Sequence, residues 1–261
     1  MSSRTRAILA TSNAVALGVA LVCNGLANAL PLNGMNTGEL SDLYPNLFVP
    51  TGLTFSIWGL IYLWLLAFAA YGFSLIRSDR DSTPLERIGP WFAVNALANA
   101  AWIFAWHWQL VPLSLAIMGA LLATLIVLYQ RLEVGLAPAS AADRWLVHAP
   151  VSVYLGWITV ASIANVTTLA IDLGVSPFGS VAAALTVGVL ATAVAIASRM
   201  LWARHDVLFA LVVSWALVGI TLKRVGAAEE GSAVVAGAAV VGLVVLGVGV
   251  VGTVVRTRRS S

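Results

Sequence analysis

Long apolar stretches alternate with short polar ones along the whole chain. A helix that crosses the hydrocarbon core of a bilayer needs about 20 mostly apolar residues. Pro50, Pro112 and the triplet Arg204, His205 and Asp206 are among the breaks between such stretches. The pattern predicts an all-α protein that crosses the cell membrane several times. The expected spans are residues 7–30, 51–76, 90–107, 110–131, 146–171, 180–200, 207–222 and 232–255.

The positions of the basic residues support this division into eight spans. Lys and Arg concentrate in the cytoplasmic loops of membrane proteins. With eight spans, twelve of the fourteen basic residues fall on the side that holds both termini, and only Lys223 and Arg224 fall on the other. We therefore predict that both termini face the cytoplasm. The first segment has an alternative interpretation as a cleavable secretory signal, although its apolar stretch is longer than is usual for one.

Composition excludes several classes of protein. Hydrophobic residues make up 60% of the 261 positions and charged residues 10%, against about 25% charged in a soluble domain. The small excess of basic residues lies in loops and not on one face, so no nucleic-acid partner is expected. A single cysteine, Cys23, leaves no disulfide framework.

Ionisable residues are absent from the middle of every predicted span. Ion-coupled transporters and proton pumps normally bury such side chains, because these groups bind or relay the ion. The three histidines, His107, His148 and His205, lie apart along the chain, and no acid–base pair can be assembled around them. We therefore expect no enzyme, no catalytic residue, no metal site and no required cofactor.

Trp, Tyr and Asn occur inside the predicted spans at helical spacing. Residues three and four apart share a face of a helix, and asparagine amides that face lipid are unfavourable, so these faces should point inward. Aromatic walls with a few polar groups suit a large, planar, mostly apolar ligand. The alternative is that the asparagines only join helices and the tryptophans only fill the core. The candidate ligand-binding residues are Trp58, Tyr62, Asn99, Trp102, Tyr154, Trp157 and Asn165.

Three spaced motifs in this set resemble those of the TspO/MBR family, the tryptophan-rich sensory proteins and relatives of the peripheral benzodiazepine receptor. That family has a proline eight residues before a tryptophan and a tyrosine four residues after it. It also has an asparagine three residues before a tryptophan, and a tyrosine followed by a tryptophan and an asparagine. The matching residues here are Pro50, Trp58 and Tyr62, then Asn99 and Trp102, and then Tyr154, Trp157 and Asn165.

The resemblance covers about residues 1–172 and implies a dimeric five-helix bundle. It further implies a pocket for porphyrins, sterols or benzodiazepine-like drugs, in which Trp58 and Trp157 are the pocket's tryptophans. Gly52 and Val153 depart from the family pattern, which usually has an aromatic residue and a proline there. Three additional helices follow, so we expect a TspO-like domain at 1–172 and a three-helix extension at 173–261.

The leading functional hypothesis is a membrane receptor or carrier that binds a planar hydrophobic ligand, with a tetrapyrrole as the best single candidate. The alternatives are an enzyme that modifies or degrades such a ligand and a structural or regulatory subunit without one. The expected partners are this ligand, the lipid bilayer and a second copy of the chain. The polar connection 31–50 is expected to cover the pocket or to be a mobile linker. The small residues of the last helix should pack on a neighbouring helix.

Overall fold

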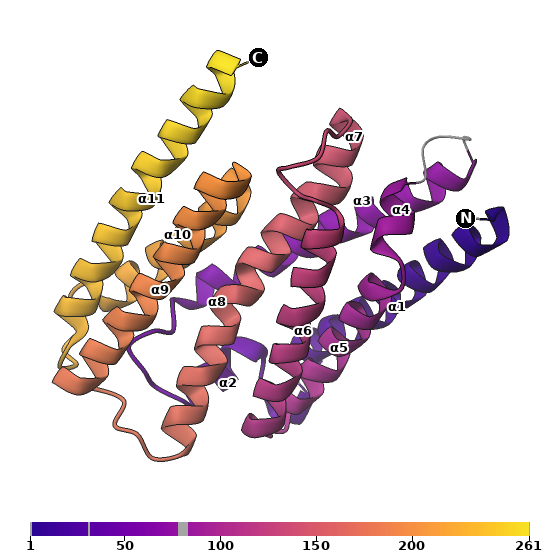
Figure 1. The fold of residues 1–261 in the computed structure, drawn as a ribbon. Coiled ribbons are helices and arrows are strands. Elements are labelled where there is room, and N and C mark those ends of the chain that lie inside the picture. The colour runs from indigo at the N-terminus through magenta and orange to yellow at the C-terminus, as the bar shows by residue number, and fades with distance from the viewer. Residues whose placement is uncertain (1, 31, 78–82, 261) are drawn as a thin grey trace.

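Eight long helices make up most of the computed structural model, which describes residues 2–30, 32–77 and 83–260 (Figure 1). They are α1 (Ser3–Ala29), α3 (Ile57–Arg77), α5 (Trp91–His107), α6 (Val111–Arg131), α8 (Ala149–Asp172), α9 (Ser180–Arg204), α10 (Val207–Arg224) and α11 (Ser232–Ser260). The short elements are η1 (Leu32–Gly34), α2 (Thr37–Asp42), η2 (Gly52–Ser56), α4 (Thr83–Ile88), α7 (Ala141–Asp143) and η3 (Arg144–His148).

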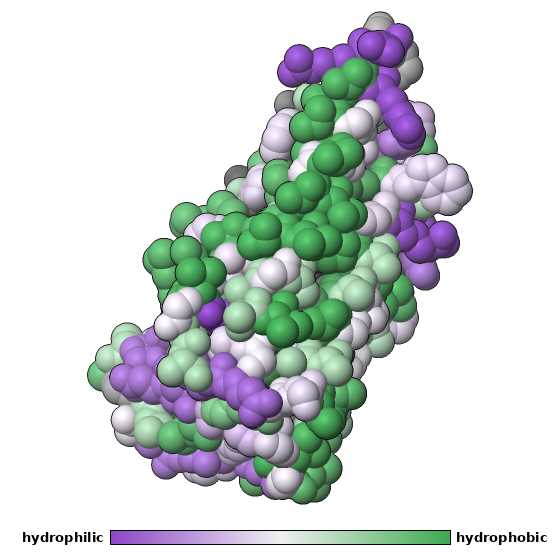
Figure 2. Space-filling view, turned by 90° about the vertical axis from the view of Figure 1, so that its left-hand side faces the viewer, coloured by the Kyte–Doolittle hydropathy of each residue, from purple (hydrophilic) through white to green (hydrophobic). Residues whose placement is uncertain are grey.

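Seven of the described helical segments are long and apolar enough to cross a membrane. They are α1, η2 with α3, α6, α7 through α8, α9, α10 and α11. The remaining predicted span corresponds to α5, whose 17 residues are at the lower end of the length that can cross a bilayer. Figure 2 shows polar side chains gathered at two ends of the molecule with an apolar band between them. The multi-pass all-α fold is confirmed, while the cytoplasmic placement of the termini stays a prediction.

The two ends of the bundle differ in what they contain. Both termini, α4 and α7 lie toward one end, which we call the arginine-rich end, and α2 lies toward the other, which we call the α2 end (Figure 1). This is the alternation expected from the basic residues. Pro31, the first residue of the connection 31–50, and Arg80, one of the twelve basic residues counted on the side of the termini, lie outside the described residues.

Local signals explain where several helices begin and end. Pro112 lies in the first turn of α6, where a missing N–H costs nothing. Asp206 precedes α10, and its side chain accepts a hydrogen bond from the backbone N–H of Phe209. Helix α9 ends at His205, whose left-handed φ of 53° turns the chain into α10. The triplet at 204–206 is therefore a tight turn between two helices.

In the first half the long helices pack around a closed circuit in the order α3, α1, α5, α6 and α8, and α8 returns to α3. Helix α1 packs on α3 and α5, α5 on α6, and α6 on α8. Helix α10 lies against α8, α9 and α11. A Cβ added at Gly156 in α8 would lie 3.1 Å from the Cβ of Val212, so this glycine allows α8 and α10 to approach closely. The last three helices thus dock on the first five through α10.

Helix α11 packs within this chain, as its small residues predicted. It contacts α9 and α10. A Cβ at Gly242 would lie 2.9 Å from a methyl group of Val194, and one at Gly249 the same distance from Leu201. Gly237, which the sequence placed in the same contact, has open space beside it. Close packing therefore involves only part of the glycine pattern.

Candidate ligand-binding site

Aromatic rings from α3 and α8 meet in the interior of the bundle. The ring of Trp58 stacks on that of Tyr62, with centroids 5.3 Å apart and planes 23° apart. It meets the rings of Tyr154 and Trp157 edge-on, at centroid distances of 5.9 and 6.3 Å. Phe55 meets Trp157 edge-on at 5.9 Å. The aromatic faces that the sequence predicted on separate helices therefore form one cluster.

Two cavities adjoin this cluster. The larger has a volume of about 430 Å³ and extends to the α2 end of the bundle. The smaller has a volume of about 40 Å³ and lies against α8. Thr37, Phe55, Trp58 and Trp102 border both cavities, so these side chains form the partition between them. Tyr62 borders the larger cavity, whereas Trp157 and Asn165 border the smaller.

Asn99 and Tyr154 lie behind the cavities in a chain of hydrogen bonds. The amide nitrogen of Asn24 in α1 donates to Oδ1 of Asn99 at 2.7 Å, and the amide nitrogen of Asn99 donates to the hydroxyl of Tyr154 at 3.0 Å. The two residues are buried and border neither cavity. Both residues form hydrogen bonds with other protein groups. The ring of Tyr154 in turn contacts the ring of Trp58 edge-on. Contact of either residue with a ligand stays a prediction.

The side chain of Asn165 has hydrogen-bond partners in the protein, whereas the indole N–H of Trp157 has none among the described residues. Oδ1 of Asn165 accepts hydrogen bonds from the hydroxyl of Ser114 at 2.9 Å and from the indole nitrogen of Trp102 at 3.4 Å. The indole nitrogen of Trp157 is buried and has no hydrogen-bond partner among the described residues. Leaving a buried donor unpaired costs about 1–3 kcal/mol. Trp157, which borders the smaller cavity, therefore has a hydrogen-bond donor without a partner in the part of the chain that the structure describes.

Asn95 belongs to the same helical stripe as Asn99 but has a different environment. Its amide nitrogen donates to the hydroxyl of Thr124 at 2.8 Å and to the carbonyl of Leu121 at 3.1 Å, both in α6. It is fully buried and borders neither aromatic cavity. For this asparagine the packing interpretation holds, because its amide joins α5 to α6.

The connection between α1 and α3, residues 32–50, lines the cavities at the α2 end, and we call it the cover. It contains more structure than its polar composition suggested. Asn36 caps α2, since its Oδ1 accepts from the N–H groups of Gly38 and Glu39 at 3.0 Å each. Oε2 of Glu39 accepts from the N–H of Asn36 at 2.8 Å, which completes a capping box. Residues of α2 line both cavities.

The end of α5 anchors this cover. His107 is fully buried, with Nδ1 3.0 Å from the carbonyl oxygen of Leu32 and Nε2 3.3 Å from the hydroxyl of Thr37. The indole nitrogen of Trp106 donates to the carbonyl of Thr37 at 3.3 Å. No role was assigned to His107 from the sequence, and its partners now show that it fixes the connection 32–50.

Helix α10 also holds the cover, which the sequence did not reveal. Nζ of Lys223 lies 3.1 Å from Oδ1 of Asp42, and Nη2 of Arg224 donates to the carbonyl of Asn46 at 2.7 Å. Arg224 is 4% exposed although it ends a helix. The only signal in the sequence was that Lys223 and Arg224 are the two basic residues on their side of the predicted topology. Helix α10 thus supports the cover of the aromatic cavities.

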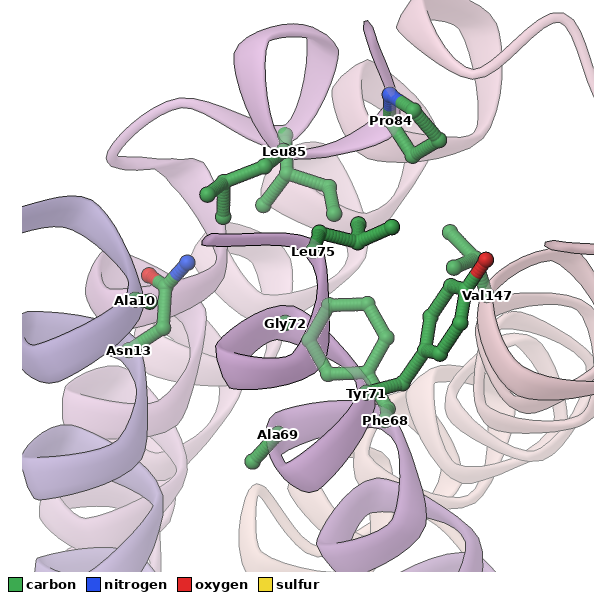
Figure 3. Close-up of a pocket in the computed structure, with 11 residues that line it drawn as sticks. Ala10, Asn13, Phe68, Ala69, Tyr71, Gly72, Leu75, Pro84, Leu85 and Val147 are labelled. Atoms are coloured by element: carbon green, nitrogen blue, oxygen red, sulfur yellow. The ribbon is translucent and has the colours of Figure 1, made fainter. Parts of the chain in front are cut away.

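A further hollow lies near the arginine-rich end, between α1, α3, α4 and η3 (Figure 3). Asn13, Phe68 and Tyr71 are among the side chains around it, and Oδ1 of Asn13 is buried without a hydrogen-bond partner in the described part of the chain. Its volume is about 10 Å³, which is about enough for one water molecule. This hollow is too small for an organic ligand.

Comparison with known proteins gives one match. A family model described as TSPO-like protein matches residues 8–252. The match extends beyond residue 172, where the resemblance seen in the sequence stopped, and includes most of the last three helices. Neither the curated proteins nor the solved structures contain a match. The division of the chain at 172 into a domain and an extension stays a prediction.

Proposed function

This chain belongs to the TSPO-like protein family, and from that premise we propose that it is a receptor or carrier for a planar hydrophobic ligand. The ligand occupies the two cavities beside Trp58, with a tetrapyrrole as the leading candidate. The proposal further assigns a binding role, without chemical change of the ligand, because the two carboxylates that border the larger cavity already have partners in the protein. Glu39 completes the cap of α2, and Asp42 pairs with Lys223.

The observation that carries the proposal is the unpaired indole N–H of Trp157 beside a cavity with aromatic walls. A ligand with a carbonyl, carboxylate or other acceptor group can accept this hydrogen bond and relieve the cost of the unpaired donor. The rings of Trp58 and Phe55 border the same cavity and offer flat surfaces for an aromatic ligand.

The size and polarity of the larger cavity favour the same class of ligand. Its volume of about 430 Å³ lies within the range of about 300–1,000 Å³ found for small-molecule sites. Asn24 and Asn28 supply amide groups to its wall, and Glu39 and Asp42 lie in the part formed by the cover. An apolar macrocycle with a few polar substituents fits this combination of aromatic and amide groups.

Trp157→Phe should weaken binding of protoporphyrin IX about tenfold, because the ring remains but the N–H donor is lost, a loss of about 1.4 kcal/mol. Quenching of tryptophan fluorescence on titration into the detergent-purified protein measures the dissociation constant. Absence of saturable quenching in the wild-type protein would contradict the tetrapyrrole assignment. Conversion of the porphyrin during the titration, detected by mass spectrometry, would favour the enzyme alternative.

The matched control is Trp108→Phe. Trp108 is half exposed at the end of α5 and borders none of the cavities described here, so its replacement should leave the affinity unchanged. Equal affinities of Trp157→Phe and Trp108→Phe would show that the indole N–H of Trp157 does not contact the porphyrin.

Removal of residues 34–43 should accelerate release of protoporphyrin IX about tenfold or more, because α2 forms a wall of both cavities. Asp42→Asn, which removes the ion pair with Lys223, should accelerate it less, since an exposed ion pair contributes at most about 1 kcal/mol. Stopped-flow recovery of tryptophan fluorescence measures the rate.

Glu133→Gln serves as the control for the cover. It removes the ion pair with Arg87, 2.8 Å long, at the arginine-rich end, and should leave the release rate unchanged. If the deletion variant folds and releases the porphyrin at the wild-type rate, the connection 32–50 is a linker and not a cover.

A further inference from the structure

A third cavity, of about 620 Å³, opens at the arginine-rich end where the last three helices meet the first five. It lies between the start of α8, the turn between α9 and α10, and the end of α11. None of its lining residues borders the aromatic cavities. Its basic, aromatic and apolar lining residues include Arg144, Trp145, His148, Arg204, His205 and Leu208.

Basic side chains dominate the polar part of this cavity. Arg144 is exposed, and its guanidinium has no hydrogen bond or ion pair within the described part of the chain. The guanidinium of Arg204 lies over the ring of Tyr129, 5.5 Å from its centroid, and donates one hydrogen bond of 3.2 Å to the carbonyl of Val134, so part of its five N–H donors stays unused. His148 and His205 add two further ring nitrogens each. The cavity therefore presents unused donors and positive charge to an anion.

The one acidic residue in the lining is engaged by the protein itself. Oδ2 of Asp206 accepts from the hydroxyl of Tyr129 at 2.7 Å, and Oδ1 accepts from the backbone N–H of Phe209 at 3.0 Å. Both oxygens lie 2.6 Å from the hydroxyl of Ser152. Asp206 is 7% exposed, so its carboxyl group faces these donors more than the cavity.

An apolar groove of about 430 Å³ continues from this cavity along α3, α8 and α10. Leu208 borders both the cavity and the groove. The ring of Trp145 in the cavity stacks on that of Trp64 in the groove, with centroids 6.4 Å apart and planes 16° apart. The remaining lining of the groove is Ser56, Ile57, Leu60, Val153, Leu211, Val212 and Trp215.

The length of the groove matches half a bilayer. Its wall on α10 runs from Leu208 to Trp215, and the turn that carries Arg204 ends at Asp206, so the nine helical residues from Val207 to Trp215 reach from this turn to the far end of the groove. Nine residues of helix span about 14 Å. Half of the hydrocarbon core is about 15 Å thick. The groove can therefore hold one acyl chain of a lipid whose headgroup lies at the arginine-rich end.

We propose that this cavity and groove form a binding site for an anionic phospholipid at the junction of the two halves of the chain. The phosphate lies between Arg144 and Arg204, because guanidinium groups match phosphate oxygens in geometry and charge. One acyl chain lies in the groove beside Leu208. A soluble phosphate compound shares the headgroup chemistry but would leave the groove unused.

The headgroup is tested by native mass spectrometry of the full chain in mixed micelles with dioleoyl-phosphatidylglycerol or dioleoyl-phosphatidylcholine. Wild-type protein should bind phosphatidylglycerol more tightly than phosphatidylcholine, whose cationic choline opposes the positive cavity, and Arg144→Gln should weaken binding of phosphatidylglycerol about tenfold and that of phosphatidylcholine less. The control is Arg199→Gln, which removes the same charge from an exposed position of α9 at the same end. Equal weakening by both variants would mean attraction by general surface charge and would overturn the site.

The acyl chain is tested by competition against bound dioleoyl-phosphatidylglycerol. Glycerol 3-phosphate and the short-chain dihexanoyl lipid should each compete at least about tenfold more weakly than the dioleoyl lipid, since neither fills the groove. Competition by glycerol 3-phosphate at equal concentration would identify a soluble phosphate site and overturn the lipid assignment. Porphyrin binding uses other residues, so its outcome is independent of these results.

Discussion

Gly219→Ala should lower the unfolding temperature of the protein sharply and weaken ligand binding with it. Gly219 lies in α10 at the point where this helix crosses η2. A Cβ at Gly219 would overlap the hydroxyl of Thr54 and lie 2.9 Å from Cβ of Pro50. Overpacking of this kind costs about 1–3 kcal/mol. Circular dichroism during heating in detergent measures the loss.

The crossing is also held by hydrogen bonds that the added methyl group would stretch. The backbone N–H of Thr51 donates to the carbonyl of Gly219 at 3.2 Å, and the indole nitrogen of Trp215 donates to the carbonyl of Thr54 at 2.9 Å. Phe55 lies in η2 and Trp58 lies in the first turn of α3 that follows it, and both residues border the two aromatic cavities. A shift of η2 therefore moves the walls of the ligand site.

Two further variants separate the clash from a general effect of replacing glycine. Gly59→Ala in α3 has no atom within 4 Å of the added Cβ, and should be neutral or stabilising because alanine favours a helix. Thr54→Ala in the Gly219→Ala background removes the overlapping hydroxyl and should recover part of the lost stability. If Gly219→Ala unfolds at the wild-type temperature, η2 can shift to make room for the methyl group without loss of stability.

The spans could be predicted from the sequence because they depend on local properties. Length and hydropathy placed all eight long helices, although α1 begins earlier than expected, α3 begins later because η2 precedes it, and α9 and α11 end a few residues later. Helix α2 was not predicted, although Asn36 and Glu39 have the spacing of a capping box. A six-residue helix inside a polar connection gives no periodic signal, so only its cap could have indicated it.

The sequence predicted which helix faces of the candidate site point inward, but it did not predict which side chains contact one another. Spacing indicated that Asn95 and Asn99 point away from lipid, and both are buried. It could not distinguish Asn95, which bonds to α6, from Asn99, which bonds to Asn24 and Tyr154. The difference depends on which helix lies beside each asparagine of α5, and this is determined by tertiary packing.

The burial of charged residues at helix ends was the main feature that the sequence did not reveal. Asp206 was placed in a break between two spans, which the turn between α9 and α10 confirms, and Arg224 was only counted on the side opposite the termini. The two residues are 7% and 4% exposed. Composition places a charge near the membrane surface but does not reveal whether protein groups cover it. Both residues connect α10 to earlier parts of the chain, so they indicate how the two halves are joined.

Asp206→Ala should destabilise the protein by about 3 kcal/mol or more, the other large effect that we expect. The substitution removes the acceptor of the hydroxyls of Tyr129 in α6 and Ser152 in α8, and of the N–H of Phe209 at the start of α10. Each buried donor left unpaired costs about 1–3 kcal/mol, and loss of a helix cap alone costs about 1 kcal/mol. Chemical denaturation in mixed micelles, followed by circular dichroism, measures the difference.

Asp206→Asn distinguishes the hydrogen bonds from the shape of the side chain. Its amide oxygen can still cap α10, and the hydroxyls of Tyr129 and Ser152 can rotate to accept from the amide nitrogen. This variant should therefore retain more than half of the stability that Asp206→Ala loses. Asp172→Ala removes an exposed carboxylate at the α2 end and should change stability by less than about 0.5 kcal/mol. If Asp206→Ala behaves like Asp172→Ala, the junction of α6, α8 and α10 is held by apolar packing alone, and the contact at Gly156 becomes its main support.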